Sequence, residues 1–168
     1  MIPPEVDSYL AKDTGEILRP DRKAAEAAAA VVIAATVEDG RAGAHHGDAL
    51  FAGGCGRRFD GTAEIMWNSL QKLAALPDET HIYCAHEYTL ANLEFARWAD
   101  PDNTELANYQ HWCQQQRELQ QPTLPTPLAV QRQINPFLRA ENVGLQHRWQ
   151  QHNAVDLFAA LRSAKDRF

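Results

Sequence analysis

The sequence predicts an α+β protein in which a small sheet portion precedes a helical domain. Two short apolar runs, "ALFAGG" and "THIYCA", have the length and composition of buried strands, and an amphipathic helical pattern lies between them. From residue 89 onward nearly all of the apolar spacing has the helical period, apart from the proline-rich "PTLPTP". Strands that come early and helices that come late indicate the end of a mixed sheet domain followed by a helical domain.

Composition and charge exclude several classes of protein. With 168 residues, 45% hydrophobic and 23% charged, the chain has the length and composition of about one folded domain. No apolar run approaches the roughly 20 residues of a membrane span, and the longest, Ala27–Val37, lies too far from residue 1 for a secretory signal. The net charge of -6 gives no sign of the basic surface that binds nucleic acid. A small anionic substrate remains possible, but it would need a local basic patch on this acidic chain.

The cysteines favour a reducing compartment. Cys55, Cys84 and Cys113 are odd in number and never form a C-x-x-C pair. This argues against a disulfide framework or a thiolate zinc site and for a cytoplasmic location. We expect Cys55 and Cys84 to be small buried residues without a catalytic role.

The first 45 residues differ in character from the rest of the chain. "MIPPEVDSYLAKDTGEILRPDRK" has turn signals but no sustained period of 2 or 3.6. "AAEAAAAVVIAATV" is either an alanine-rich helix or a helix that runs into a strand at Val31–Val37. "EDGRAGAHHGD" is loop-like. We therefore treat residues 1–45 as a separate N-terminal segment and expect it to be poorly ordered.

Residues 47–88 predict a strand, a helix and a second strand. "ALFAGG" is the first strand, closed by glycines, and "THIYCA" is the second. "GTAEIMWNSLQKLAALP" is an amphipathic helix that Thr62 can cap and that ends before Pro77. The side chains that share its apolar face are Ile65, Met66, Ser69, Leu70 and Leu73.

Beyond residue 88 the sequence predicts helices joined by short connections. One begins near Thr89, and "ELANYQHWCQQQRELQQ" forms a long one with a solvated glutamine-rich face. "PTLPTP" must be extended, because each proline fixes φ and biases the preceding residue away from helix. "LAVQRQINPFLR", "VGLQHRWQQH" and "AVDLFAALRSAK" supply further helix. The side chains available for packing in the first two helices are Leu90, Leu93, Trp98, Leu106, Tyr109, Cys113 and Leu119.

Two residues at strand boundaries have the chemistry of metal ligands. Asp48 precedes the first strand and His86 follows the second, where side chains point out of a sheet end. A carboxylate and a neutral imidazole are donors that zinc accepts. Taken alone, a histidine at a strand end is more often an ordinary polar residue. His45 and His46 favour the metal reading only slightly, since adjacent histidines are also common in loops.

Four stretches together resemble a known family. "GDALFAGGCGRRFDGTAE", "CAHEYTLANLEFA", "QINPFLR" and the terminal "LRSAKDRF" are similar to glyoxalase II, the hydroxyacylglutathione hydrolases of the metallo-β-lactamase superfamily. The resemblance covers about residues 47–168, with the motifs in the family's order. It implies that residues 46–88 are the C-terminal part of a metallo-β-lactamase αββα fold. Residues 89–168 would be the all-helical, glutathione-binding domain that follows it.

The resemblance also assigns roles to individual residues. Asp48 falls on the aspartate that bridges two metal ions in the family, and His86 on a histidine ligand of one of them. The metals would be zinc, with iron or manganese as alternatives. Phe59 stands where the family often has tyrosine, which puts one hydrogen bond to the tripeptide in doubt. The residues that fall on the glutathione pocket are Arg57, Arg58, Phe59, Tyr88, Arg162 and Lys165.

The activity implied by this resemblance is metal-assisted thioester hydrolysis. In the family, two metal ions lower the pKa of a shared water, and the hydroxide attacks the thioester carbonyl of S-D-lactoylglutathione. Glutathione and D-lactate leave, as a step of methylglyoxal detoxification. No protein nucleophile takes part, so Ser69 and the cysteines need no catalytic role. The basic residues match the substrate, because glutathione carries carboxylates.

The sequence departs from the family at the metal site. The superfamily motif H-x-H-x-D-H is absent, and no two histidines have H-x-H spacing. Two ligands cannot build a binuclear centre, because each metal needs about four donors. Two hypotheses follow. The chain is a hydroxyacylglutathione hydrolase whose site is incomplete or completed by another chain, or it is a catalytically silent form that at most binds glutathione or a partner chain. We expect a monomer with a glutathione thioester as its small-molecule partner.

Overall fold

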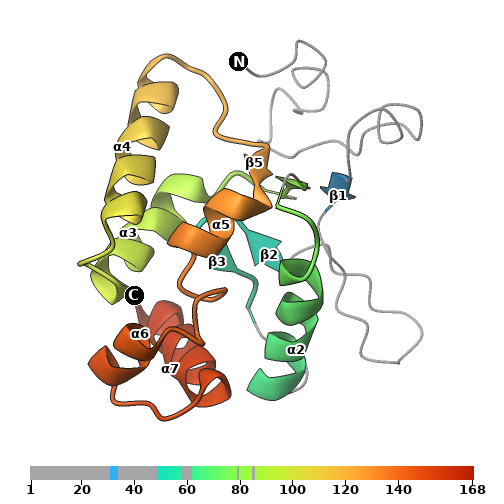
Figure 1. Cartoon of the computed structure of the whole chain (residues 1–168). Coiled ribbons are helices and arrows are strands. Elements are labelled where there is room, and N and C mark those ends of the chain that lie inside the picture. The colour runs from blue at the N-terminus through green and yellow to red at the C-terminus, as the bar shows by residue number, and fades with distance from the viewer. Residues whose placement is uncertain (1–30, 34–48, 58–61, 79, 85) are drawn as a thin grey trace.

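The computed structural model describes residues 31–33, 49–57, 62–78, 80–84 and 86–168 (Figure 1). Most of the predictions for residues 1–45, including their order, lie outside these residues. The exception is β1 (Val31–Ile33), which shows that the valine-rich end of the alanine run is a strand. Within the described residues the molecule combines short strands with helices, as an α+β protein does. None of the described helices is long and apolar enough to cross a membrane.

The strands form two small sheets. β4 (His81–Tyr83) lies between β1, which runs parallel to it, and β5 (Thr126–Pro127), which runs antiparallel. β2 (Leu50–Phe51) and β3 (Gly54–Cys55) form a separate antiparallel hairpin. The prediction had "ALFAGG" as one strand, whereas the chain turns at Ala52 and Gly53 and pairs back on itself.

Two glycines allow this turn to approach its neighbours closely. Gly53 has a φ of +70°, in the left-handed region that favours glycine. A Cβ at Gly53 would lie 2.8 Å from a methyl carbon of Leu93, and a Cβ at Gly54 would lie 2.8 Å from Cγ of Asn92. The hairpin therefore packs directly on α3 (Thr89–Ala99), which carries both neighbours.

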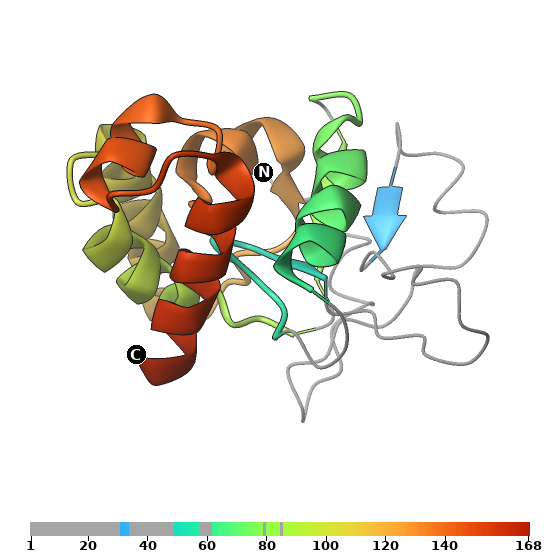
Figure 2. The ribbon, with the colours of Figure 1, turned by 90° about the horizontal axis from the view of Figure 1, so that it is seen from below.

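The helix that follows the hairpin begins where the sequence predicts. α2 (Ala63–Ala74) starts after Thr62, whose hydroxyl accepts a hydrogen bond from the Ile65 N–H. Its buried face differs by part of a turn from the prediction, because Met66, Trp67 and Leu70 are buried while Ile65 is 42% exposed. Trp67 packs against Phe158 of α7 (Ala154–Arg167), and Figure 2 shows these two helices side by side.

The remaining described residues are almost wholly helical, as predicted. α3 and α4 (Thr104–Glu118) lie side by side in Figure 1, and α5 (Leu128–Ile134) and α6 (Val143–Arg148) follow the extended "PTLPTP" segment. Asparagine side chains cap three of these helices: Asn103 for α4, Asn142 for α6 and Asn153 for α7.

Two clusters of buried side chains form the core. The larger joins the β2–β3 hairpin and α2 to α7, with Phe95, Phe137 and Phe158 in contact at its centre. The smaller joins α3, α4 and α5 through Leu93, Leu106, Cys113 and Ile134, among others. Trp98 packs as expected, against Phe95, Trp149 and Phe168, although it is 54% exposed. Leu119 was also expected to pack, but it is 67% exposed. Leu119 lies just past the end of α4, so the helical face no longer directs it inward.

Candidate functional site

Residues from three distant parts of the chain meet at the β2–β3 hairpin. Arg57 follows β3, His86 and Tyr88 lie between β4 and α3, and Arg162 and Lys165 lie in the second half of α7. All five were predicted to hold a metal or glutathione. Asp48, Arg58 and Phe59, the other predicted site residues, lie outside the described residues.

His86 and Tyr88 form a stack that reaches the hairpin. Their rings lie 5.1 Å apart with an interplanar angle of 20°, and the Tyr88 ring lies 5.6 Å from that of Phe51 in β2. Glu87, between them, accepts hydrogen bonds from the N–H and the hydroxyl of Thr123 at 3.0 and 2.8 Å. The segment is therefore anchored, while Tyr88 remains 53% exposed and can contact a ligand.

Arg162 is buried and binds the backbone of the hairpin. Its guanidinium donates to the carbonyl oxygens of Cys55 at 2.8 Å and Gly56 at 3.2 Å, and to the Asp166 carboxylate at 2.9 Å. It also lies over the ring of Phe137, 5.5 Å from the centroid. Only 5% of this residue is exposed, whereas Arg57, which follows the bonded segment, is exposed.

Lys165 reaches the hairpin through Asn92. Its Nζ donates to Asn92 Oδ1 at 2.6 Å and lies 5.2 Å from the centroid of the Phe95 ring. Burial, helped by the neighbouring Arg162 charge, lowers the pKa of Lys165 to about 8. Lys165 therefore combines a partly buried ammonium group with a fixed position.

Sequence reasoning missed three buried amides that bind the same hairpin. Asn92 donates to the carbonyl oxygen of Ala52 at 3.1 Å, and Gln131 accepts from the N–H of Gly53 at 2.8 Å. Asn135 donates to the carbonyl oxygens of Phe51 and Gly54. Asn92 and Asn135 lie within the stretches "TLANLEFA" and "QINPFLR", so their presence inside apolar helical patterns was the available signal.

The cysteines are free and buried, as predicted for Cys55 and Cys84. Burial raises the pKa of the Cys55 thiol to about 11 and that of Cys84 to about 12. Thiols with such pKa values stay protonated near neutral pH.

The described residues do not fit a two-metal centre by themselves. His86 is the one predicted ligand among them, and these residues contain no group of three or more His, Cys, Asp or Glu side chains that could hold a metal ion. A structural or catalytic metal needs at least three protein ligands. What the described site offers is cationic and aromatic side chains around a buried hairpin.

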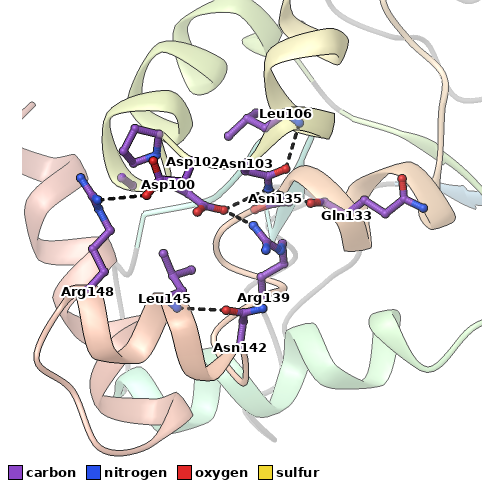
Figure 3. A network of polar contacts seen from close by, with 12 residues as sticks. Asp100, Asp102, Asn103, Leu106, Gln133, Asn135, Arg139, Asn142, Leu145 and Arg148 are labelled. Carbon is purple, nitrogen blue, oxygen red and sulfur yellow. Dashed lines mark hydrogen bonds and ion pairs between the residues drawn. The ribbon is translucent and has the colours of Figure 1, made fainter.

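A polar cavity of about 420 Å³ lies away from this cluster. It opens between the α3–α4 turn and α6, and Figure 3 shows the contacts around it. Arg139 pairs with Asp100 there, Arg148 with Asp102, and Asn103 donates to Asp100 at 3.0 Å and to the Gln133 carbonyl at 2.9 Å. The charges along it are largely paired with one another, and it is not lined by any of the predicted site residues that the structure describes.

The comparisons with known proteins identify the class. Residues 87–168 match the family described as "Hydroxyacylglutathione hydrolase C-terminus". Three curated relatives, each named "Hydroxyacylglutathione hydrolase", come from Chromohalobacter salexigens, Nitrosomonas eutropha and Aliivibrio fischeri. They are 52%, 50% and 49% identical to this chain over 126, 128 and 126 residues. Each match covers 73% of this chain and 49–50% of the relative, so the chain spans about half the length of these relatives.

Over this portion the chain is therefore similar to proteins named hydroxyacylglutathione hydrolase. Its C-terminal portion belongs to the hydroxyacylglutathione hydrolase family, glyoxalase II. The resemblance seen in "AHEYT", "QINPFLR" and "RSAKD" is confirmed. The metallo-β-lactamase assignment of residues 46–88 stays a prediction.

Proposed function

We propose that this chain carries the glutathione-binding part of a hydroxyacylglutathione hydrolase. The parent activity is the metal-dependent hydrolysis of S-D-lactoylglutathione to glutathione and D-lactate, in the cytoplasm. The observation that carries the proposal is that Tyr88 contacts Phe51 of the hairpin and Lys165 reaches the hairpin through Asn92, both within the residues that match this family. Arg57 follows the same hairpin and is exposed. A local group of cations on an acidic chain is suited to hold a small molecule that carries two carboxylates, as glutathione does.

Each of these side chains has a suitable role toward glutathione. The Lys165 ammonium, already oriented by Asn92, would bind one carboxylate of the tripeptide. Arg57 is exposed and would bind the other with its forked N–H groups. The exposed part of Tyr88 would pack along the peptide and offer its hydroxyl.

Hydrolysis needs groups that the described residues do not supply. In the family, two divalent ions would provide the activated water, with Asp48 and His86 among their ligands. With one described ligand, the isolated chain is expected to bind glutathione without hydrolysing its thioester. Completion of the site by a second chain would restore the hydrolase, whereas the purified chain alone would still bind glutathione without turnover.

The test combines binding, metal content and turnover on the full chain. Calorimetry with S-methylglutathione should give saturable binding that weakens with added salt, because the contacts are between charges. Lys165→Met should weaken it about tenfold, in line with the loss of one charge-assisted contact of about 1.5 kcal/mol. Lys72→Met, which removes an exposed lysine on α2, is the matched control and should leave binding unchanged.

The outcomes separate the two hypotheses. Binding without zinc-dependent turnover of S-lactoylglutathione supports a silent glutathione-binding chain. Zinc-dependent turnover of S-lactoylglutathione by the purified chain would show that this chain is a hydrolase by itself. No binding of S-methylglutathione at millimolar concentration would contradict the proposed function altogether.

A further inference from the structure

Glu87 lies between two of the predicted site residues and contacts a different part of the chain from either of them. The rings of His86 and Tyr88 stack at 5.1 Å, and the Tyr88 ring lies 5.6 Å from that of Phe51 in the β2–β3 hairpin. In an extended chain, alternate side chains point to the same side. His86 and Tyr88 therefore share one side, while Glu87 extends to Thr123, in the segment that joins α4 to β5.

Thr123 is bonded to both chain neighbours of Tyr88. Oε1 of Glu87 accepts the Thr123 N–H at 3.0 Å and the Thr123 hydroxyl at 2.8 Å. The hydroxyls of Thr123 and Thr89 lie 2.8 Å apart. A hydroxyl has one hydrogen and an ionised carboxylate only accepts, so Thr123 donates to Glu87 and accepts from Thr89. One distant residue thus fixes the chain immediately before and immediately after Tyr88.

This connection is shielded from water. Thr89 and Thr123 are each 1% exposed, and the side chain of Glu87 is 13% exposed. Thr123 lies in a segment outside helix and strand, where a buried N–H needs an acceptor from a side chain. A hydrogen bond to an ionised carboxylate is stronger than one between neutral groups, and burial strengthens it further. The backbone around Tyr88 is therefore held firmly, although Tyr88 itself is 53% exposed.

We propose that Glu87 and Thr123 are positioning residues, which act through the backbone on either side of Tyr88 to direct its ring, stacked on His86, toward the ligand. A side chain that is already oriented loses less entropy when the ligand binds, so its contact contributes more to affinity. The role of Tyr88 toward glutathione rests on the proposed function, whereas the hold on its backbone does not. The competing role of the Glu87–Thr123 contact is to stabilise the fold alone.

The first measurement needs no ligand and uses NMR of the full chain. In the wild type, the Thr123 amide should exchange slowly although it lies outside helix and strand. The ring protons of His86 should be shifted upfield by the Tyr88 ring, and Tyr88→Leu identifies that shift by removing the ring. Glu87→Ala should remove most of the shift and accelerate Thr123 exchange at least about tenfold relative to α7 amides, because the buried N–H loses its acceptor.

Two further variants of similar size control this measurement. Glu87→Gln keeps an acceptor oxygen and should keep most of the His86 shift and of the Thr123 protection. Glu94→Ala removes an exposed carboxylate of α3 and should leave both unchanged. Fast Thr123 exchange in the wild type would overturn the hold on Tyr88, even if Glu87→Ala did not fold.

The second measurement separates positioning from a purely structural role. S-methylglutathione affinity is measured for the wild type, Glu87→Ala, Tyr88→Leu and the double variant. Glu87→Ala should weaken binding about fivefold in the wild type and less than about twofold when Tyr88 is already leucine, because its effect passes through Tyr88. Glu87→Gln should keep most of the affinity. If Glu87→Ala does not fold, Thr123→Val, which keeps the shape and loses the hydroxyl, replaces it with an expected loss of about twofold to threefold.

Each other outcome has a defined meaning. An equal loss in both backgrounds would mean that Glu87 acts on the ligand without Tyr88. Unchanged affinity together with faster Thr123 exchange would mean that the contact stabilises the fold alone. Either result overturns the positioning role. If the wild type binds no S-methylglutathione, the glutathione function fails, and the NMR measurement still decides whether Glu87 and Thr123 hold the stack of Tyr88 on His86.

Discussion

Lys165 and Asn92 form a hydrogen bond of 2.6 Å that links α7 to α3, and Asn92 in turn binds the β2–β3 hairpin. Asn92 uses its oxygen for the lysine and its nitrogen for the carbonyl of Ala52. One asparagine therefore orients a cation and holds a turn, so the position of the cation depends on the hairpin. The same geometry makes the charge of Lys165 sensitive to pH.

The first prediction concerns the pH dependence of glutathione binding. Because burial lowers the pKa of Lys165 to about 8, the ammonium that would bind a carboxylate loses its proton as pH rises through 8. Affinity for S-methylglutathione should fall severalfold between pH 7 and 9. Lys165→Arg keeps its charge over this range, so its affinity, measured by calorimetry on the same ligand, should fall much less. Equal pH profiles for the two proteins would contradict the assignment.

The second prediction concerns the close approach of the hairpin to α3. Gly54→Ala adds a methyl group 2.8 Å from the Asn92 side chain, which is held at both ends and cannot move freely. We expect a loss of about 1–3 kcal/mol in the free energy of unfolding, measured by urea denaturation. Gly144→Ala in α6, where the nearest atom is the Asn142 oxygen at 3.2 Å, is the comparison and should change stability by less than about 1 kcal/mol. Similar losses in both variants would show that the hairpin is not tightly packed.

These contacts mark the limit of what the sequence could predict. The helices were predictable because their signals are local: Thr62 before α2, and an apolar period within α3, α4 and α7. The prediction of packing failed at the end of α4, where Leu119 leaves the packed face. Local periodicity carries no information about how far a neighbouring helix extends over a given turn.

The hairpin and the side chains that bond to its backbone come together through contacts between distant residues. Gln131 lies 78 residues from Gly53, and Arg162 lies 107 residues from Cys55. A glutamine in a helical pattern is normally read as exposed, and nothing nearby in the sequence reveals its buried partner. The family resemblance pointed to Arg162 and Lys165 as a basic pair, but it did not distinguish the buried guanidinium from the partly accessible ammonium.

The third prediction concerns stability at alkaline pH. Burial raises the pKa of Cys84 from 9.0 to about 12 in the folded state. Above pH 9 the unfolded chain releases this proton and the folded chain does not, so unfolding becomes more favourable as pH rises. Cys84→Ala removes this effect. The stability advantage of the wild type over the variant should therefore shrink by about 2 kcal/mol between pH 8.5 and 10.5. Urea denaturation at the two pH values measures it, and a constant difference would mean that the thiol is accessible.

The last prediction concerns the polar network at the α3–α4 turn, shown in Figure 3. Asn103 caps α4 by accepting the Leu106 N–H at 3.1 Å, and its amide nitrogen also binds Asp100 and the Gln133 carbonyl. Asn153 caps α7 in the same way, accepting the Asp156 N–H at 2.9 Å, but its amide nitrogen reaches only the Asp156 side chain on the same exposed turn.

The two caps therefore differ in what they connect. Asn153→Ala should lose only a cap, about 1 kcal/mol in the free energy of unfolding. Asn103→Ala also removes a donor from the Asp100 carboxylate, which pairs with Arg139, and from the carbonyl of Gln133 in α5. The loss should therefore be larger by about 1–2 kcal/mol. Urea denaturation of both variants under one condition measures the difference. Equal losses would mean that the contacts of Asn103 with Asp100 and Gln133 add nothing to the cap, and that α4 and α5 are joined by their apolar faces alone.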